Sequence, residues 1–175
     1  MTQLKDNILQ KAKNIARIKV RDYNPVVLVL LMYLLHIALA PTIVWIAKVI
    51  GIKNTVTETW DDAFGDFTLT HMIIEVGFVG PIIETLLHQL LAYYLFSLIP
   101  FLKRNWGIIV IVGGVVFAVT HPYSTYHTIA ILPFGCIIMF AYIVKKGKGG
   151  FWIAAAIHII NNLIEIAKMK SDGFF

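Results

Sequence analysis

The 175 residues of this chain are 58% hydrophobic and only 14% charged, and their mean hydropathy is +0.77. Soluble domains carry about 25% charged residues, so this composition excludes an ordinary soluble protein and indicates a polytopic membrane protein. The net charge of +5 needs no nucleic-acid partner, because six basic residues gather before the first apolar run: Lys5, Lys11, Lys13, Arg17, Lys19 and Arg21.

The chain is predicted to have two parts, a basic arm over residues 1–22 and a single transmembrane helical domain over residues 23–170. Within the arm, apolar residues recur at helical spacing from Leu4 to Ile18, which favours an amphipathic helix on anionic lipid. The alternative is an arm that only fixes the topology. Because Lys and Arg concentrate on the cytoplasmic side of membrane proteins, we expect a multi-pass protein of the cell membrane with a cytoplasmic N-terminus.

Five apolar regions follow the arm, at residues 26–50, 69–101, 106–120, 128–144 and 151–167. In the second region Gly80 and Pro81 favour a helix start, because proline suits the first helical turn. We therefore expect the main helix there over residues 82–99, preceded by a short re-entrant or surface helix over residues 70–79. Only helices satisfy their own backbone groups in lipid, so the fold class is an all-α bundle of about five to six transmembrane helices.

Loop charges predict the sidedness of this bundle. Basic loops are expected inside and the other loops outside, which places residues 103–104 and 145–148 in the cytoplasm and residues 51–68 and 121–127 outside. Glu84 and His121 then lie near the outer ends of their helices. His158, however, lies only about 10 Å from the inner surface at 1.5 Å per residue. Either the last helix begins deeper in the membrane, or one region is re-entrant and the predicted sidedness is wrong.

Four polar side chains stand in these apolar regions: Glu84, His121, His158 and Asn162. A titratable group at bilayer depth costs about 2.5–3.5 kcal/mol on insertion scales, so it persists mainly where it faces a polar cavity. His158 and Asn162 are four residues apart and share a helix face. The four groups therefore predict one shared site.

Each of these groups also has a plainer interpretation. Glu84 could serve as a carboxylate at a helix start, His121 as the cap of a helix end, and His158 with Asn162 as hydrogen-bonding glue between helices. Further histidines, including His36, His88 and His127, are explained as polar groups at helix interfaces. Among them His88 stands out, because it lies one helical turn after Glu84.

The order and spacing of these residues resemble the motifs of the CPBP family, the CAAX-protease and bacteriocin-processing membrane proteins. That family carries Glu-Glu-x-x-x-Arg, then Phe-x-x-x-His, then His-x-x-x-Asn or Asp. Here the motifs begin at Glu84, Phe117 and His158. The resemblance implies that Glu84 and His121 activate a water molecule, and that His158 and Asn162 stabilise an oxyanion.

The first motif departs from the family pattern, because Thr85 and Gln89 stand where the family has its second Glu and its Arg. Residues at this spacing lie on one helix face and can pair. Losing both together removes a charge pair without leaving a buried charge unpaired. We therefore expect an active site with altered chemistry or substrate, and ordinary peptide-bond proteolysis is in doubt.

Three functions remain open at this point. The first is an intramembrane hydrolase that cleaves an amide or ester bond in a membrane-embedded substrate. The second is acyl transfer with the same groups, because the resemblance includes members needed for N-acylation of lipoproteins. The third is a noncatalytic bacteriocin-immunity or scaffold protein. The expected partners are membrane lipids and a lipidated or membrane-embedded peptide or lipoprotein.

No cofactor is expected. A zinc ion is the alternative, since Glu84, His121 and His158 would supply two imidazoles and one carboxylate with an open position for water. Against it, the sequence has no His-x-x-x-His or cysteine pair that would anchor a metal locally.

Overall fold

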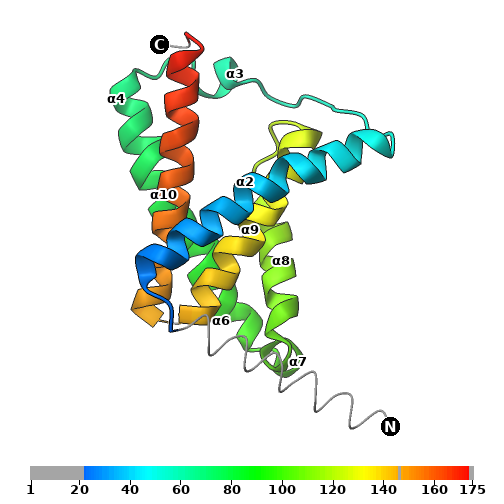
Figure 1. Ribbon diagram of the computed structural model, residues 1–175, viewed down its shortest axis with the longest axis vertical. Coiled ribbons are helices and arrows are strands. Elements are labelled where there is room, and N and C mark those ends of the chain that lie inside the picture. Colours follow the sequence, from blue (N-terminus) through cyan, green and yellow to red (C-terminus); the bar gives the residue numbers. More distant parts are fainter. Residues whose placement is uncertain (1–21, 146, 174–175) are drawn as a thin grey trace.

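The computed structural model describes residues 22–145 and 147–173, so the predicted amphipathic arm lies outside the described residues apart from its last residue (Figure 1). The elements are α2 (Pro25–Val49), α3 (Trp60–Phe64), α4 (Leu69–His71), the π-helix η1 (Met72–Val79), α5 (Gly80–Glu84), the π-helix η2 (Thr85–Leu91), α6 (Ala92–Ser97), α7 (Pro100–Arg104), α8 (Trp106–Val119), α9 (Thr125–Lys145) and α10 (Gly147–Ser171). Within the described residues there is no strand beyond an isolated bridge between Val56 and Ser124. The predicted all-α class is confirmed.

Four helical stretches of the described chain are long and apolar enough to cross a membrane: Pro25–Val49, Leu69–Ser97, Thr125–Lys145 and Gly149–Ser171. The apolar helix α8 is shorter, with 14 residues. At 1.5 Å per residue it extends about 21 Å, less than the about 30 Å of a hydrocarbon core. This inventory confirms a multi-pass membrane protein.

Helix α9 lies at the centre and packs against α8, α2 and α10. Figure 1 shows α7, the end of α9 and the start of α2 at one end of the bundle, and α3 and the C-terminus at the other. Lys145 at the end of α9 donates through Nζ to the carbonyl oxygen of Tyr23 at 2.6 Å. The basic residues Lys103, Arg104 and Lys145 thus share one end, and which side of the membrane that end faces stays a prediction.

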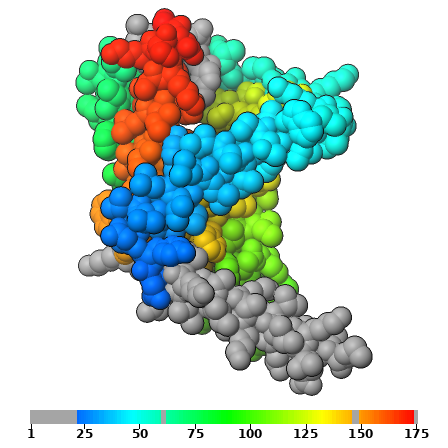
Figure 2. Space-filling view, viewed as in Figure 1, coloured from blue at the N-terminus to red at the C-terminus, as the bar shows by residue number. Residues whose placement is uncertain are grey.

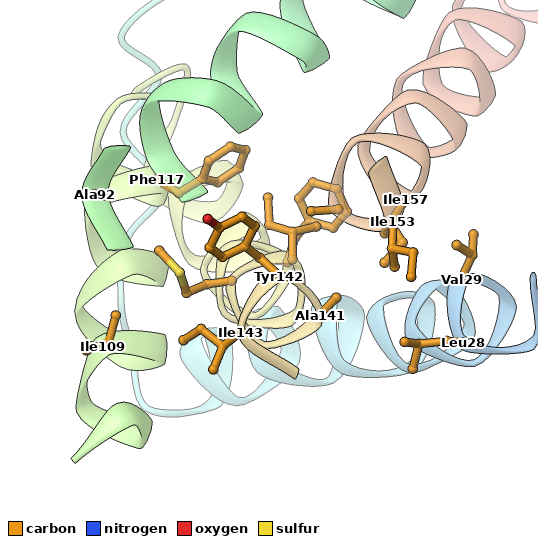
Figure 3. Packing of buried hydrophobic residues seen from close by; sticks show 14 residues of the cluster. Leu28, Val29, Ala92, Ile109, Phe117, Ala141, Tyr142, Ile143, Ile153 and Ile157 are labelled. Carbon is orange, nitrogen blue, oxygen red and sulfur yellow. The ribbon is translucent and has the colours of Figure 1, made fainter. Parts of the chain in front are cut away.

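The core forms where α8 and α9 approach backbone to backbone. A methyl group added at Gly135 would lie only 2.9 Å from the carbonyl oxygen of Gly114, so small residues allow this close packing. Figure 3 shows apolar side chains around α9, with Phe117 from α8 and Ile157 from α10 among them. This packing fixes the end of α8, where His121 follows, against the middle of α10.

Helix α2 lies across one face of the bundle as a ridge (Figure 2). Its buried residues are only Leu28, Val29 and Ala47, while large apolar residues such as Leu30, Leu34 and Trp45 are exposed. An apolar exposed face is what a helix presents to lipid tails, where no water is available to solvate polar groups.

The region from Leu69 to Ser97 differs from the prediction, because it is one continuous helical stretch rather than a surface helix followed by a new helix at Gly80. The N–H of Gly80 donates five residues back, to the carbonyl oxygen of Glu75. This π-helical pattern lets the chain pass through Pro81, which has no N–H to donate, without ending the helix. Glu84 therefore lies in the middle of a long helix, not one turn after a helix start.

The last helix also differs from the prediction, because α10 begins at Gly147 rather than near residue 151. His158 consequently lies eleven residues, about 16 Å, after the first residue of its helix. Its depth in the membrane stays a prediction.

A segment after α2 is bonded to the loop that carries His121. The N–H of Thr57 donates to the carbonyl oxygen of Tyr123 at 2.9 Å, and the N–H of Thr125 donates to that of Thr55 at 3.0 Å. The hydroxyl of Tyr126 also donates to the carbonyl oxygen of Ile52 at 2.8 Å. These bonds fix the turn between α8 and α9.

Candidate active site

Three of the four predicted site residues meet at one carboxylate oxygen. Oε2 of Glu84, the last residue of α5, lies 3.1 Å from Nε2 of His121 and 3.6 Å from Nε2 of His158. His121 follows the end of α8, and His158 lies in the middle of α10 with only 2% of its surface exposed. Side chains from α5, from the turn after α8 and from α10 therefore meet at one place. This was predicted, because a buried polar group is costly unless it faces other polar groups.

The hydrogen bonds of His121 determine where its proton lies. Its Nδ1 lies 2.8 Å from the carbonyl oxygen of Phe117, which can only accept, so Nδ1 carries a hydrogen. A neutral ring then has a bare Nε2 facing Glu84 Oε2 at 3.1 Å, where two acceptors would oppose each other. One proton is therefore shared between these two atoms. Burial opposes the charged form of His121, but its bonds to Glu84 and to Phe117 and the nearby carboxylate raise its pKa overall.

Phe117 connects the histidines. Its side chain is fully buried, and its ring lies 4.5 Å from the ring of His121 and 5.3 Å from that of His158, measured between centroids. Its carbonyl oxygen accepts from His121 one helical turn later. The spacing of Phe-x-x-x-His thus places the carbonyl that fixes the tautomer of His121 and the ring that packs against both imidazoles.

Asn162 lies in the same cavity but is already hydrogen-bonded. Its Nδ2 donates to the carbonyl oxygen of Val76 at 2.9 Å. That carbonyl has no helical donor from the positions four and five residues later, because the N–H of Gly80 goes to Glu75 and Pro81 has none. Asn162 therefore holds η1 in place. An amide nitrogen carries two hydrogens, so the second is still available to a bound group.

The four predicted site residues line a cavity of about 630 Å³ between α2, η1, α5, α9, α10 and the loop after α8. Its remaining wall is largely apolar, with Phe64, Phe67, Met72, Ile131, Ile166 and Met169 among the lining residues. A cavity of this size with a few convergent polar groups is typical of a site for an organic ligand.

Sequence reasoning missed two histidines of this cavity. His36 from α2 and His127 from α9 both line it, although each was explained as an interface group. For His36 the signal that could have found it is the one that found Glu84, a titratable side chain in an apolar region. His127 lies in the predicted loop 121–127, where this signal does not apply, and only the start of α9 at Thr125 places it in a helix.

Thr85 and Gln89, the residues that depart from the family motif, lie against the interior and not in the cavity. Both are fully buried. Among the described residues, Thr85 Oγ1 and both polar atoms of the Gln89 amide have no hydrogen-bond partner. No buried charge is stranded there, in keeping with the loss of a Glu and Arg pair as a unit, but three polar atoms are left unsatisfied.

The zinc alternative gains no support from the geometry. Within the described part of the chain, no group of three or more His, Cys, Asp or Glu side chains is arranged to hold a metal ion. In particular Glu84, His121 and His158, the ligands that zinc would need, do not form such a group.

Comparison with known proteins yields one family. The family model described as type II CAAX prenyl endopeptidase Rce1-like matches residues 66–164, more than half of the chain, and this range contains all four predicted site residues. Searches of curated proteins and of solved structures found no match. The match confirms the resemblance to CAAX proteases of the CPBP family and identifies, at family level, a CAAX-protease-like intramembrane hydrolase. The chain therefore belongs to the type II CAAX prenyl endopeptidase Rce1-like family.

Proposed function

We propose that this protein hydrolyses an amide bond of a lipidated, membrane-embedded peptide, with Glu84 and His121 activating the attacking water. The observation that carries the proposal is the contact of 3.1 Å between Glu84 Oε2 and His121 Nε2 in the wall of a cavity inside a membrane bundle. A carboxylate that shares a proton with a fixed imidazole is suited to general acid and base catalysis.

The reaction follows from these two groups. Glu84 accepts a proton from water while the hydroxide adds to the carbonyl carbon of the substrate. The tetrahedral intermediate then collapses, the C–N bond breaks, and the proton held between Glu84 and His121 goes to the leaving nitrogen. Water is consumed and a carboxylic acid and an amine are formed. His121 keeps its orientation throughout because Nδ1 stays bonded to the carbonyl oxygen of Phe117.

His158 and Asn162 are proposed to stabilise the oxyanion of that intermediate. Nε2 of His158 lies 3.6 Å from the reactive carboxylate oxygen, too long for a hydrogen bond to it. A donor held near the reacting carbonyl without a strong partner is suited to the charge that develops there. The second amide hydrogen of Asn162 adds a further donor.

The lining of the cavity supports a substrate with an apolar attachment. Phe64, Phe67 and Met72 form part of its wall, and large apolar side chains cover the outer surface of the bundle. A lipid-anchored peptide can therefore enter with its chain in an apolar environment while its amide reaches Glu84. Membrane lipids are the other expected partners, and the cell membrane is the proposed location.

Cleavage of a defined peptide tests the proposal. The purified protein in lipid nanodiscs is incubated with a farnesylated peptide that ends in Cys-aliphatic-aliphatic-X, and the products are identified by mass spectrometry. We expect release of the C-terminal tripeptide by the wild type and by the control Glu58→Gln, which removes an exposed carboxylate outside the cavity, and none by Glu84→Gln.

Other outcomes would redirect the assignment. A product in which the cleaved acyl group is attached to an added amine would identify acyl transfer. Undiminished turnover by Glu84→Gln would contradict the proposed role of this carboxylate, and absence of any turnover in the wild type would favour a noncatalytic protein.

The orientation is proposed from the shared location of the basic residues. With Cys136→Ala as background, Thr57→Cys should react with an impermeant thiol reagent in intact cells, and Lys103→Cys only after lysis. The reverse pattern would place the N-terminus outside.

A further inference from the structure

His88 belongs to no motif, yet it contacts Glu84 directly and His121 through Thr120. Its Nδ1 lies 3.2 Å from the backbone carbonyl oxygen of Glu84, four residues earlier. Its Nε2 lies 3.3 Å from the hydroxyl of Thr120, which in turn lies 3.3 Å from Nδ1 of His121. Together with the bond between His121 and Glu84, these contacts form a closed ring of four residues.

The donors and acceptors in this ring assign a role to each nitrogen of His88. Because a carbonyl oxygen only accepts, Nδ1 of His88 carries the hydrogen, and the neutral ring therefore presents a lone pair at Nε2. The hydroxyl of Thr120 has one hydrogen and two nearby acceptors, Nε2 of His88 at 3.3 Å and the carbonyl oxygen of Phe117 at 2.8 Å. The hydroxyl hydrogen is shared between these two acceptors, and the carbonyl oxygen, which has two lone pairs, also accepts from Nδ1 of His121 at 2.8 Å.

The hydrogen bonds at the Phe117 carbonyl connect His88 to the reaction. His121 depends on that carbonyl to keep its hydrogen on Nδ1 and its Nε2 towards Glu84. The Thr120 hydroxyl donates to the same carbonyl at 2.8 Å, and its oxygen lies 3.3 Å from His88 and 3.3 Å from His121, so the contact with His88 holds this hydroxyl beside His121. The ring of His88 also packs edge-on against Phe117, with centroids 5.4 Å apart, so it supports the same turn sterically.

We propose that His88 is a positioning residue that fixes the orientation and tautomer of His121 through Thr120. This inference rests on the proposed function, since it concerns the group that activates water. His88 touches neither water nor substrate in this mechanism. It acts only through the turn at the end of α8.

Kinetics of four variants test the pathway with the farnesylated peptide in nanodiscs. His88→Ala and Thr120→Val should each lower kcat about 10- to 100-fold, the loss expected for a misplaced catalytic group, while KM stays unchanged. The double variant should be no worse than either single one, because both break the same contact path. His88→Gln should retain most of the activity, since its amide oxygen can still accept from Thr120. His71→Ala, an exposed histidine outside the cavity lining, is the matched control.

Nuclear magnetic resonance of ¹⁵N-histidine-labelled protein at fixed pH gives a second measurement that needs no turnover. The ring nitrogen signals of His121 should shift in His88→Ala and in Thr120→Val, but not in His71→Ala. If the wild type cleaves nothing while these shifts occur, the proposed function fails and the positioning role stands. Additive kinetic losses, or His121 signals unchanged in both variants, would overturn the role of His88.

Discussion

Two faces of one helical stretch, residues 80–91, differ in how their polar groups are satisfied. On one face Glu84 and His88 are hydrogen-bonded to residues of the turn after α8. On the other, Thr85 and Gln89 are fully buried and, among the described residues, their side-chain polar atoms have no partner. A buried polar atom without a partner costs about 1–3 kcal/mol, so the first face organises the cavity while the second lowers stability. Neighbouring polar residues of one helix thus have opposite effects: one pair organises the cavity, and the other lowers the stability of the fold.

The largest effect is expected from removal of His121, the hydrogen-bond partner of Glu84 on the first face. His121→Ala should lower turnover of the farnesylated peptide by about 10²–10⁴, the usual contribution of a general acid or base. The thermal midpoint in detergent should change little, because Phe117 stays packed against Phe134. Turnover comparable to the wild type would show that the bond at 3.1 Å to Glu84 is only structural.

Truncation of Asn162 should lower both the activity and the stability of the protein. Asn162→Ala removes a proposed oxyanion donor, worth about 10²–10³ in kcat. It also leaves the Val76 carbonyl without its partner, which should lower the free energy of unfolding by about 1–3 kcal/mol. Asn162→Asp is the informative comparison. An aspartate keeps the shape of the side chain, but its carboxylate oxygen and the Val76 carbonyl oxygen are both acceptors and cannot bond to each other. A loss of activity without loss of stability would contradict the bond to Val76.

The protein should become more stable when the unpaired polar atoms of the second face, those of Thr85 and Gln89, are removed. Gln89→Leu should raise the free energy of unfolding by about 1–3 kcal/mol, because it replaces an unpaired buried amide with an apolar side chain. Measurement by thermal denaturation in detergent would show this as a higher midpoint, with turnover nearly unchanged. Destabilisation by Gln89→Leu would mean that the amide has a partner such as a buried water.

Restoring the charge pair of the family motif should produce the smallest net effect. Thr85→Glu alone and Gln89→Arg alone should each destabilise the protein, because each buries an unpaired charge. The double variant should be better than the sum of the two, with a coupling of about 0.5–3 kcal/mol in thermal denaturation. Strictly additive effects would show that the two side chains do not face each other.

Much of the site could be predicted from the sequence, because the cost of burying a titratable group singles out Glu84, His121 and His158 whatever the details of the fold. The all-α membrane class follows as directly from composition. The continuity of the helix through Pro81 could not be predicted, since a change from four-residue to five-residue hydrogen bonding leaves no mark on residue type. That error also misplaced Glu84 at a helix start.

Other parts of the site depended on contacts between distant segments. The lining of the cavity by His36 requires knowing that α2 lies across α10, and residue spacing within α2 contains no such information. Likewise, the proposed role of Thr120 depends on its hydroxyl lying between the imidazole of His88 and that of His121, which are 33 positions apart in the sequence. Loop charges predicted only that the basic residues share one end, which the arrangement of α7 and α9 agrees with.

Pro81 and Asn162 do not bond to each other, yet the hydrogen bond of Asn162 is needed because Pro81 has no N–H. The proline leaves the Val76 carbonyl without a donor in its own helix, and the asparagine supplies one from α10. An aspartate, which the third family motif also permits, could accept but not donate when ionised. Among related chains, the choice between asparagine and aspartate should therefore vary together with proline. The two substitutions would be inherited as one unit across a distance of 81 positions in the sequence.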